Sequence, residues 1–377
     1  MTMSDAQIVL SKIPTKTYYD PAVFVEETEQ VFRRYWGLAC LTTEVGVSGA
    51  YVTTHIGGDN IIVVRDEDQL RAFHNVCPHR GSEIASGTGV ATEFKCPYHA
   101  WTYGLDGSLV RVPGVKKFSK GIGLRPLSLE IWGPFVFVCS DPDVAPLSYF
   151  FGDLFEYLQN KVDLIKIVSF GTMEEFNFEI EANWKVVVEN SLECYHCAYA
   201  HPGLASSIDL SKFEQWVEGW WSAQQAPQRL EGKKRGAALG QATQASAKKS
   251  GMDTARFNFL FPNLYVSIWP GSQGFSTTEI FPKGCHRTWT RHRRFFQNKV
   301  SQTEREESHA FISEVINEDI ALCESVQRGL DRGVTDQRLM VNRGGLGADE
   351  TCILHFHDLL QHKLERPTRK FVGGSSV

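Results

Sequence analysis

Two short segments each combine a cysteine with a histidine, and both side chains bind transition metals. The first contains Cys77 and His79 in the string Cys-Pro-His, and the second contains Cys96 and His99 in Cys-Pro-Tyr-His. Together they offer two thiolates and two imidazoles. Because proline and glycine residues surround both strings, we expect the two pairs to lie in loops. The pattern predicts a metal site with mixed sulfur and nitrogen ligands.

Two kinds of metal centre accept this ligand set. A Rieske [2Fe–2S] centre binds one iron through two cysteines and the other through two histidines, which raises its reduction potential. A Cys2His2 zinc site uses the same side chains, but such zinc loops usually pair Cys with Cys and His with His. We therefore interpret Cys77, His79, Cys96 and His99 as Rieske ligands, with zinc as the alternative.

A second constellation lies in residues 183–203, which contain Glu193, His196 and His201. Glu193 and His196 are three residues apart and can share one face of a helix. The two histidines are five residues apart, or roughly 140° around an ideal helix. We expect the helix to end near His201, before Pro202, so that both imidazoles can converge. Two histidines and one carboxylate form the facial triad of non-haem Fe(II) oxygenases.

The carboxylate of such a triad must come from elsewhere in the chain. Glu318 and Asp319 are the best candidates, and we expect them to open a helical stretch that continues to Leu330. Acidic residues are also favoured at a helix start by the helix dipole alone. The residue pattern does not separate Glu318 from Asp319.

With both motifs in this order, the chain resembles the catalytic α subunits of Rieske non-haem iron oxygenases, the ring-hydroxylating oxygenase family. The resemblance covers nearly the whole chain. It includes further strings at Tyr18–Pro21, Phe32–Trp36, Trp132–Val138 and Phe261–Leu264. It implies that Asp319 is the third iron ligand. The role of Asn190, six residues before His196, stays open because its spacing differs from that in the family.

The resemblance also implies a role for Glu193, where most family members have Asp. This carboxylate is expected to link a Rieske histidine of one subunit to an iron-ligand histidine of its neighbour. The Rieske histidine is His79 or His99, and position favours His99. The string Glu193-Cys194-Tyr195-His196 is most similar to the carnitine, glycine-betaine and choline monooxygenase-like members. The expected assembly is a homotrimer closed head to tail.

The fold class that we expect is α+β. Residues 1–37 form a helical segment that packs on the catalytic domain, and residues 38–150 form an all-β Rieske domain. Residues 151–377 form a helix-grip-like catalytic domain with an antiparallel sheet. Alternating apolar residues predict strands at Tyr51–Ile56, Ile61–Val64 and Phe135–Val138. The polar segment 227–250 is expected to be a loop near the active site.

Composition excludes several classes of protein. The net charge of −5 over 377 residues gives no reason to expect nucleic acid as a partner. No long apolar run predicts a membrane segment, so we expect a cytoplasmic location. Nine cysteines, two of them assigned to the cluster, argue against a disulfide framework. Cys194 and Cys197 also match a CxxC redox or metal pair, which we disfavour because no second CxxC is nearby.

The predicted function is the terminal component of a multicomponent oxygenase. The chain has no Rossmann fingerprint, so a separate NAD(P)H-dependent reductase, alone or with a ferredoxin, must supply electrons. We expect a quaternary ammonium substrate, with an arene or aromatic acid as the alternative. The non-oxygenase alternatives are a Rieske electron-transfer protein and a metal-stabilised binding protein. An aromatic cage for the substrate has candidates in Trp216, Trp220, Trp221, Phe257, Phe259, Tyr265 and Trp269.

Overall fold

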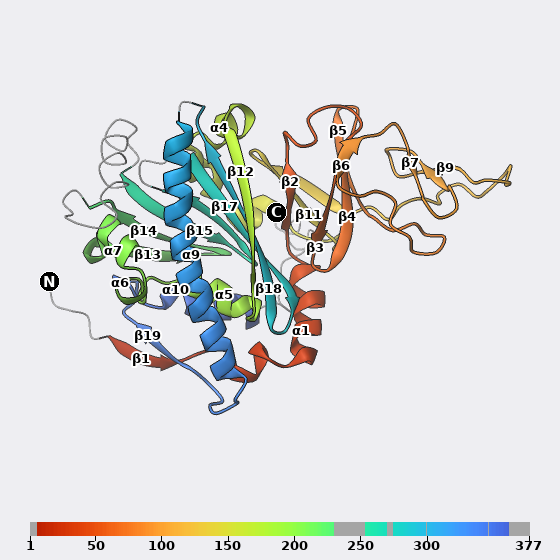
Figure 1. Ribbon diagram of the computed structural model, residues 1–377. Helices are drawn as coiled ribbons and strands as arrows, with labels where there is room; N and C mark the ends of the chain where they lie inside the picture. The colour runs from red at the N-terminus through yellow and green to blue at the C-terminus, as the bar shows by residue number, and fades with distance from the viewer. Residues whose placement is uncertain (1–5, 230–252, 270–273, 299, 346, 362–377) are drawn as a thin grey trace, which may run out of the picture. The chain divides into compact units, whose positions relative to one another are not determined.

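The computed structural model describes residues 6–229, 253–269, 274–298, 300–345 and 347–361 (Figure 1). These residues form two compact units. One contains the described residues up to Glu26 and from Phe150 onward, and the other spans Glu27–Tyr149. No described helix is long and apolar enough to cross a bilayer. Beyond Arg229, the segment that was expected to form a loop lies outside the described residues.

The Glu27–Tyr149 unit consists of antiparallel strands in three small sheets, ordered β5-β4-β3-β6, β10-β11-β2 and β7-β8-β9. The strands are β2 (Gly37–Leu41), β3 (Ala50–Ile56), β4 (Asp59–Asp66), β5 (Gln69–His74), β6 (Thr88–Val90), β7 (Phe94–Lys95), β8 (Thr102–Tyr103), β9 (Leu109–Arg111), β10 (Ser128–Trp132) and β11 (Phe135–Cys139). The three strands predicted from alternation are confirmed as β3, β4 and β11.

Strand β4 is buried on both faces and joins two apolar clusters. Ile61 and Val63 pack on one side, in the same cluster as residues of β2 and β11. Ile62 and Val64 pack on the other side, in the cluster that contains Cys77 and Cys96. The core of this unit therefore supports the loops that carry the predicted cluster ligands.

The other unit is built on one antiparallel sheet in the order β12-β18-β17-β16-β15-β14-β13. Its strands are β12 (Thr172–Ile180), β13 (Glu214–Glu218), β14 (Trp221–Pro227), β15 (Thr254–Leu260), β16 (Leu264–Ile268), β17 (Gly274–Gly284) and β18 (Arg287–Phe296). The long helix α9 (Gln302–Leu330) runs across this sheet (Figure 1). An all-β unit followed by an antiparallel sheet with a long helix confirms the α+β prediction.

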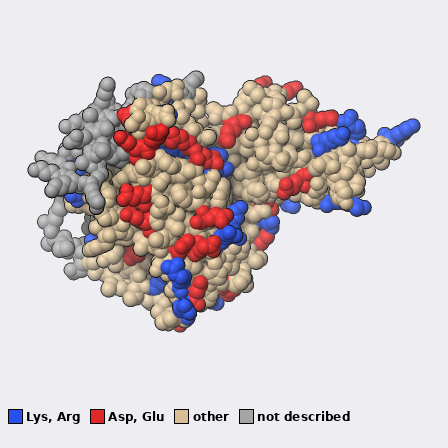
Figure 2. Space-filling model, in the orientation of Figure 1, with Lys and Arg blue, Asp and Glu red and all other residues tan. Residues whose placement is uncertain are grey.

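Helix α9 begins earlier than the sequence analysis predicted. Ser301 and Glu304 form a capping box that starts it at Gln302, so Glu318 and Asp319 lie well inside the helix. Acidic residues on its outward side, among them Glu304, Glu306 and Glu307, are exposed. Figure 2 shows acidic side chains gathered over this unit, in agreement with the negative net charge.

The N-terminal residues are more divided than the single amphipathic helix that was expected. They form β1 (Gln7–Leu10), the 3-10 helix η1 (Thr15–Tyr18), α1 (Pro21–Glu27) and the π-helical turn η2 (Thr28–Phe32). Strand β1 pairs with β19 (Leu339–Asn342). The remaining helices are α2 (Leu147–Phe151), α3 (Leu154–Gln159), α4 (Leu164–Phe170), α5 (Trp184–Ser191), α6 (Cys197–Ala200), α7 (Pro202–Ser207), η3 (Leu210–Lys212) and α10 (Thr351–Gln361).

A buried charge holds these N-terminal and C-terminal segments against α5. Glu189 of α5 lies 2.7 Å from Nη1 of Arg338 and 2.9 Å from Nε2 of His357, and it accepts a hydrogen bond from the Tyr18 hydroxyl. Burial acts to raise the pKa of Glu189, but Arg338 and His357 lower it to about 2. The carboxylate is therefore ionised and paired inside the unit.

We expect Glu189→Gln to lower the free energy of unfolding by about 3 kcal/mol, because it removes the carboxylate that pairs with the largely buried Arg338. The wild type should lose the same contribution as the pH falls from about 4.5 toward 2, since the pKa of Glu189 is depressed only in the folded state. Urea denaturation at several pH values measures both effects. Glu179→Gln, in an exposed pair with Arg287, is the control and should change stability by less than about 1 kcal/mol. Equal urea midpoints for the two variants would contradict the role of Glu189.

Candidate active site

The two Cys/His loops have the same backbone hydrogen bonds. The N–H of Cys77 donates to the carbonyl of Ser82, and the N–H of Cys96 donates to that of Trp101, at 2.8 Å in each case. Four residues after each cysteine the backbone has a positive φ, 78° at Gly81 and 56° at Ala100. The loops follow β5 and β7, so the predicted loop positions are confirmed.

The cysteine and histidine side chains of these loops differ in burial. Cys77 and Cys96 are buried, whereas His79 and His99 are exposed with ring centroids 4.7 Å apart. Burial acts to raise the pKa of Cys96, but hydrogen bonds from backbone amides and from Cys77 lower it. The hydroxyl of Tyr103 lies 3.1 Å from the Cys77 sulfur. Sulfur beside sulfur and imidazole beside imidazole is the ligand distribution of a Rieske cluster.

The zinc alternative needs a different arrangement. Two ligands of one zinc ion lie at most about 4.6 Å apart, given metal–ligand distances near 2.0–2.3 Å. Among the described residues, the group of metal-binding side chains that meets a limit of this kind is His196, His201 and Asp319, not the four loop residues. The loop side chains therefore suit a dinuclear cluster better than a single ion.

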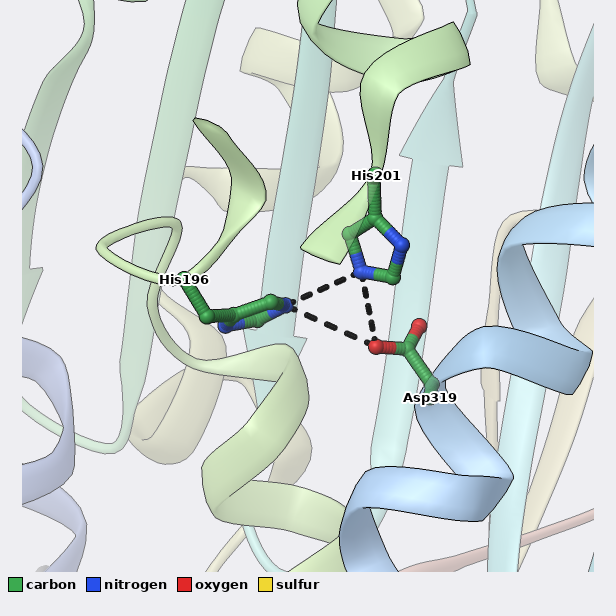
Figure 3. Close-up of side chains that lie close together, drawn as sticks. All are labelled: His196, His201 and Asp319. Carbon is green, nitrogen blue, oxygen red and sulfur yellow. Dashed lines mark hydrogen bonds and ion pairs between the residues drawn. The ribbon is translucent and has the colours of Figure 1, made fainter. Parts of the chain in front are cut away.

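His196, His201 and Asp319 converge on one point although they come from distant parts of the chain (Figure 3). The Nε2 atoms of the two histidines are 3.1 Å apart. Oδ1 of Asp319 lies 2.9 Å from Nε2 of His201 and 3.5 Å from Nε2 of His196. Three donor atoms at these distances can bind one metal ion and leave its other positions open.

Each of these three side chains has a second partner that orients it. Glu193 contacts Nδ1 of His196, and Glu318 lies 2.7 Å from Nδ1 of His201. Asn190 donates to Asp319 at 2.7 Å, which gives this residue a place that its sequence spacing left open. Hydrogen bonds to the remote atoms of metal ligands determine ring orientation and ligand basicity. Glu318 thus contacts the far side of His201, while Asp319 faces both imidazoles.

The acidic residues make this point attractive to a cation. Burial lowers the pKa of His196, but the carboxylates of Asp319 and Glu193 raise it to about 10. The pKa of His201 is likewise raised by Asp319 and Glu318 against the effect of burial. Negative potential around two imidazoles favours a bound metal cation.

The local backbone differs from the prediction. Helix α5 ends at Ser191, and not near His201, so Glu193 and His196 lie in the following turn. The short helix α6 ends at Ala200, and His201 precedes the new helix α7, which starts at Pro202. This break brings the imidazoles together. Cys194 and Cys197 are joined by a disulfide, the pairing expected of the CxxC redox pair that the sequence analysis disfavoured.

A pocket opens beside the three converging side chains. Its lining includes His196, His201 and Asp319, with Ile312, Val315 and Ile316 of α9 on one side. The other wall consists of side chains from strands β12 and β14–β18 of the sheet. They are Phe176, Gln224, Phe257, Tyr265, Ser267, Ser276, Thr278, His292 and Arg294. Trp269, which directly follows β16, also lines the pocket. A metal held by the triad would therefore face the pocket directly.

Three of the seven aromatic residues proposed for a substrate cage line this pocket: Phe257, Tyr265 and Trp269. The other four are not among its described lining residues. Trp220 packs on Phe150 and Phe261, and Phe259 packs on Tyr265 and Phe356. Phe176, His292 and Arg294 were missed. A signal for His292 and Arg294 was available in the string Arg291–Arg294, whose polar side chains directly precede Phe295 and Phe296 in one strand.

Comparison with known proteins agrees with this geometry. A family model of the ring hydroxylating alpha subunit (catalytic domain) matches residues 168–366, and one of the Rieske [2Fe-2S] domain matches residues 35–129. The chain is 34% identical to the carnitine monooxygenase oxygenase subunit of Escherichia coli (strain K12), with 92% of each chain covered. It is 31% identical to the chloroplastic choline monooxygenase of Spinacia oleracea, covering 93% of this chain and 78% of that protein.

Solved structures show the same similarity. A quaternary ammonium Rieske monooxygenase in complex with L-carnitine superposes with a TM-score of 0.80 at 30% identity, covering 94% of this chain and 96% of that one. Naphthalene 1,2-dioxygenase from Rhodococcus sp. superposes with a TM-score of 0.75 at 21% identity, covering 93% of this chain and 94% of that one, and shows a shared fold alone.

The chain therefore belongs to the Rieske non-haem iron oxygenases, in the ring-hydroxylating α-subunit family. It is a terminal oxygenase component that uses a Rieske [2Fe–2S] cluster and a mononuclear iron, and it depends on a separate reductase. The alternatives of zinc in the first site, a Rieske electron-transfer protein and a metal-stabilised binding protein are wrong, because both the cluster domain and the catalytic domain are present.

The iron content of two variants tests which of the adjacent carboxylates, Glu318 or Asp319, binds the mononuclear iron. Asp319→Asn removes the oxygen that faces both imidazoles, so we expect loss of the mononuclear iron while iron and acid-labile sulfide of the cluster remain. Glu318→Gln removes only the partner of Nδ1 on His201, and we expect iron to stay bound with affinity reduced about 10- to 100-fold. Metal and sulfide analysis of both variants measures this. Loss of iron from Glu318→Gln alone would assign the ligand to Glu318.

Proposed function

We propose specific ligands for both metal centres. The mononuclear iron is bound by His196, His201 and Asp319, and the support is their convergence at the pocket wall. The cluster is bound by Cys77, His79, Cys96 and His99, supported by the matching loops and by the pairing of like side chains.

We propose that residues 38–150 form the cluster domain and residues 151–377 the catalytic domain. Within residues 1–37, the described part up to Glu26 belongs to the catalytic unit.

We infer that the substrate is a small quaternary ammonium compound. The observation that carries this is the pocket, whose lining combines the triad of His196, His201 and Asp319 with the aromatic residues Phe176, Phe257, Tyr265 and Trp269. Each ring face attracts a methylammonium group by about 0.5–2 kcal/mol. The similarity to carnitine and choline monooxygenases over most of the chain supports the same class.

The reaction is a monooxygenation. The iron supplies the activation of dioxygen, of which one oxygen atom enters a C–H bond of the substrate. The other leaves as water, after two electrons from the reductase and two protons have been added. The aromatic wall holds the ammonium group and excludes water from the pocket. Hydroxylation of an N-methyl group gives a hemiaminal that decomposes to formaldehyde and the demethylated amine.

The proposed assembly is a homotrimer closed head to tail. It is located in the cytoplasm, with no nucleic acid or membrane as partner. Electrons come from an NAD(P)H-dependent reductase, alone or through a ferredoxin. Glu193 contacts Nδ1 of His196 and accepts hydrogen bonds from the backbone N–H groups of Tyr195 and His196, and a carboxylate with about four acceptor sites can take one more. His99 is exposed, which supports the proposal that His99 of the partner subunit reaches Glu193.

The substrate class is tested by turnover with a surrogate reductase. We expect oxygen uptake coupled to loss of substrate with carnitine, γ-butyrobetaine or another methylammonium compound. Formaldehyde, free amine and aldehyde are measured together, so that hydroxylation at either type of carbon is detected. Coupled uptake with an aromatic acid, and none with any methylammonium compound, would replace this substrate class by the alternative.

The proposed link from His99 of the partner subunit through Glu193 to His196 is tested with Glu193→Gln. We expect both metals to stay bound and product formation to slow by at least about tenfold, because the side chain connects imidazoles and is not itself a ligand. Glu179→Gln, at an exposed site, should leave the rate unchanged. Full activity in Glu193→Gln would refute this link between subunits. A stable monomer of the wild type in sedimentation would also refute it.

A further inference from the structure

A cation is buried in the pocket wall with part of its hydrogen-bonding capacity unused. Arg294 is 3% exposed and lines the pocket. Its Nη2 donates to the hydroxyl of Ser308 at the start of α9. Among the described residues, Nη1 has no hydrogen-bond partner. Burying a guanidinium whose N–H groups lack acceptors costs free energy. A ligand that accepts a hydrogen bond from Nη1 of Arg294 would remove this cost.

Two neighbouring arginines on β18 each form an ion pair with a glutamate. Arg291 lies 2.7 Å from Glu279, and Arg293 lies 2.9 Å from Glu175. Within the described part of the chain, Arg294 has no such carboxylate at ion-pair distance. Burial lowers its pKa to about 10, against the opposing effect of Glu174, so it stays charged at neutral pH.

The sheet register explains why Arg294 is left without a counter-ion. Glu174 is its cross-strand partner on β12, but that carboxylate lies 3.0 Å from Arg305. On the other side, β17 and β16 place Ser276 and then Ser267 in the same row. Residues in one cross-strand row share a face. Arg294 therefore ends a row of small hydroxyl side chains that leaves space beside its guanidinium.

The other titratable groups of the pocket wall give it two electrically different ends. His292 is half-buried, and its loss of solvation lowers its pKa to about 4, so it is neutral at pH 7. The acidic side chains in the lining are Glu193 and Asp319, at the metal-binding end. Arg294 is the one Lys or Arg among the described lining residues. Iron bound at the acidic end would balance these carboxylates, so the pocket suits a ligand that presents an anion to Arg294 and, where it is a zwitterion, its cation to the aromatic rings of Phe257 and Trp269.

The length of such a ligand follows from α9. Ser308 contacts Arg294, and Asp319 lies eleven residues further along the same helix, a rise of roughly 16 Å. Contact distances at both ends leave a span of roughly 8–10 Å for the ligand. Measured from an N-methyl carbon to a carboxylate oxygen, a ligand with three carbons between nitrogen and carboxylate carbon comes closer to this span than glycine betaine, which has a single carbon there.

We propose that Arg294 binds the carboxylate of the substrate, which is therefore a betaine whose carboxylate lies several bonds from the methylammonium group. The assignment of a methylammonium substrate rests on the proposed function, but the carboxylate contact does not. Choline, which has no carboxylate, would leave Nη1 of Arg294 unpaired and is a poor ligand.

Equilibrium binding to the holoenzyme tests the proposal by calorimetry. The probes are γ-butyrobetaine, its carboxamide analogue and choline. We expect wild type to bind the carboxylate at least about tenfold more tightly than the carboxamide. Arg294→Gln should weaken γ-butyrobetaine binding about 10- to 100-fold and leave the carboxamide within about threefold. Arg294→Lys should fall between wild type and Arg294→Gln, because it keeps the charge and loses the planar fork.

Arg287→Gln is the matched control, since Arg287 lies on the same strand but is exposed. It should bind all probes as wild type does. Equal affinity of wild type for carboxylate and carboxamide would overturn the proposal, and this comparison needs no variant that must fold. An equal loss for both probes in Arg294→Gln would also overturn it. If only an aromatic carboxylate binds, and Arg294→Gln weakens it, the methylammonium class fails while the role of Arg294 stands.

Discussion

The contact between Asp319 and the two imidazoles is the interaction on which the catalytic unit depends. It joins residues 118 positions apart, since Oδ1 of Asp319 lies 2.9 Å from Nε2 of His201. Such a contact exists only if α9 lies across the sheet with one side directed at the turn after α5. The capping box at Ser301 starts this helix, and its packing against α5 keeps its position along the sheet.

A second layer of contacts makes this geometry rigid before any substrate arrives. Glu193 and Glu318 hold the far sides of the two imidazoles, and Asn190 donates to Oδ1 of Asp319, the oxygen that faces them. Behind them, the buried carboxylate of Glu189 ties α5 to Arg338 and His357. Burying so many charges is favourable only when each is paired. The result is a site whose donor atoms need little reorganisation to bind a metal.

The sheet supplies what the metal site lacks, which is a means of orienting the substrate. Cross-strand rows place aromatic rings and hydroxyls on the face that α9 covers, and one row contains Arg294 between Glu174 and Ser276. A shift of one residue in the register of β18 would turn Arg294 to the opposite face. Strand pairing therefore determines both the polarity of the pocket and the distance from its cationic end to the metal site.

The sequence by itself determined the features that depend on short segments: the two Cys/His loops, the strands β3, β4 and β11, and the proximity of Glu193 to His196. These follow from local spacing, turn residues and alternation, which operate within about ten residues. Tertiary structure decided which of Glu318 and Asp319 faces the imidazoles, where α5 ends and which aromatic rings line the pocket. It also left Arg294 without a counter-ion. Those outcomes depend on strand register and helix packing between residues far apart in the chain, and no local pattern encodes them.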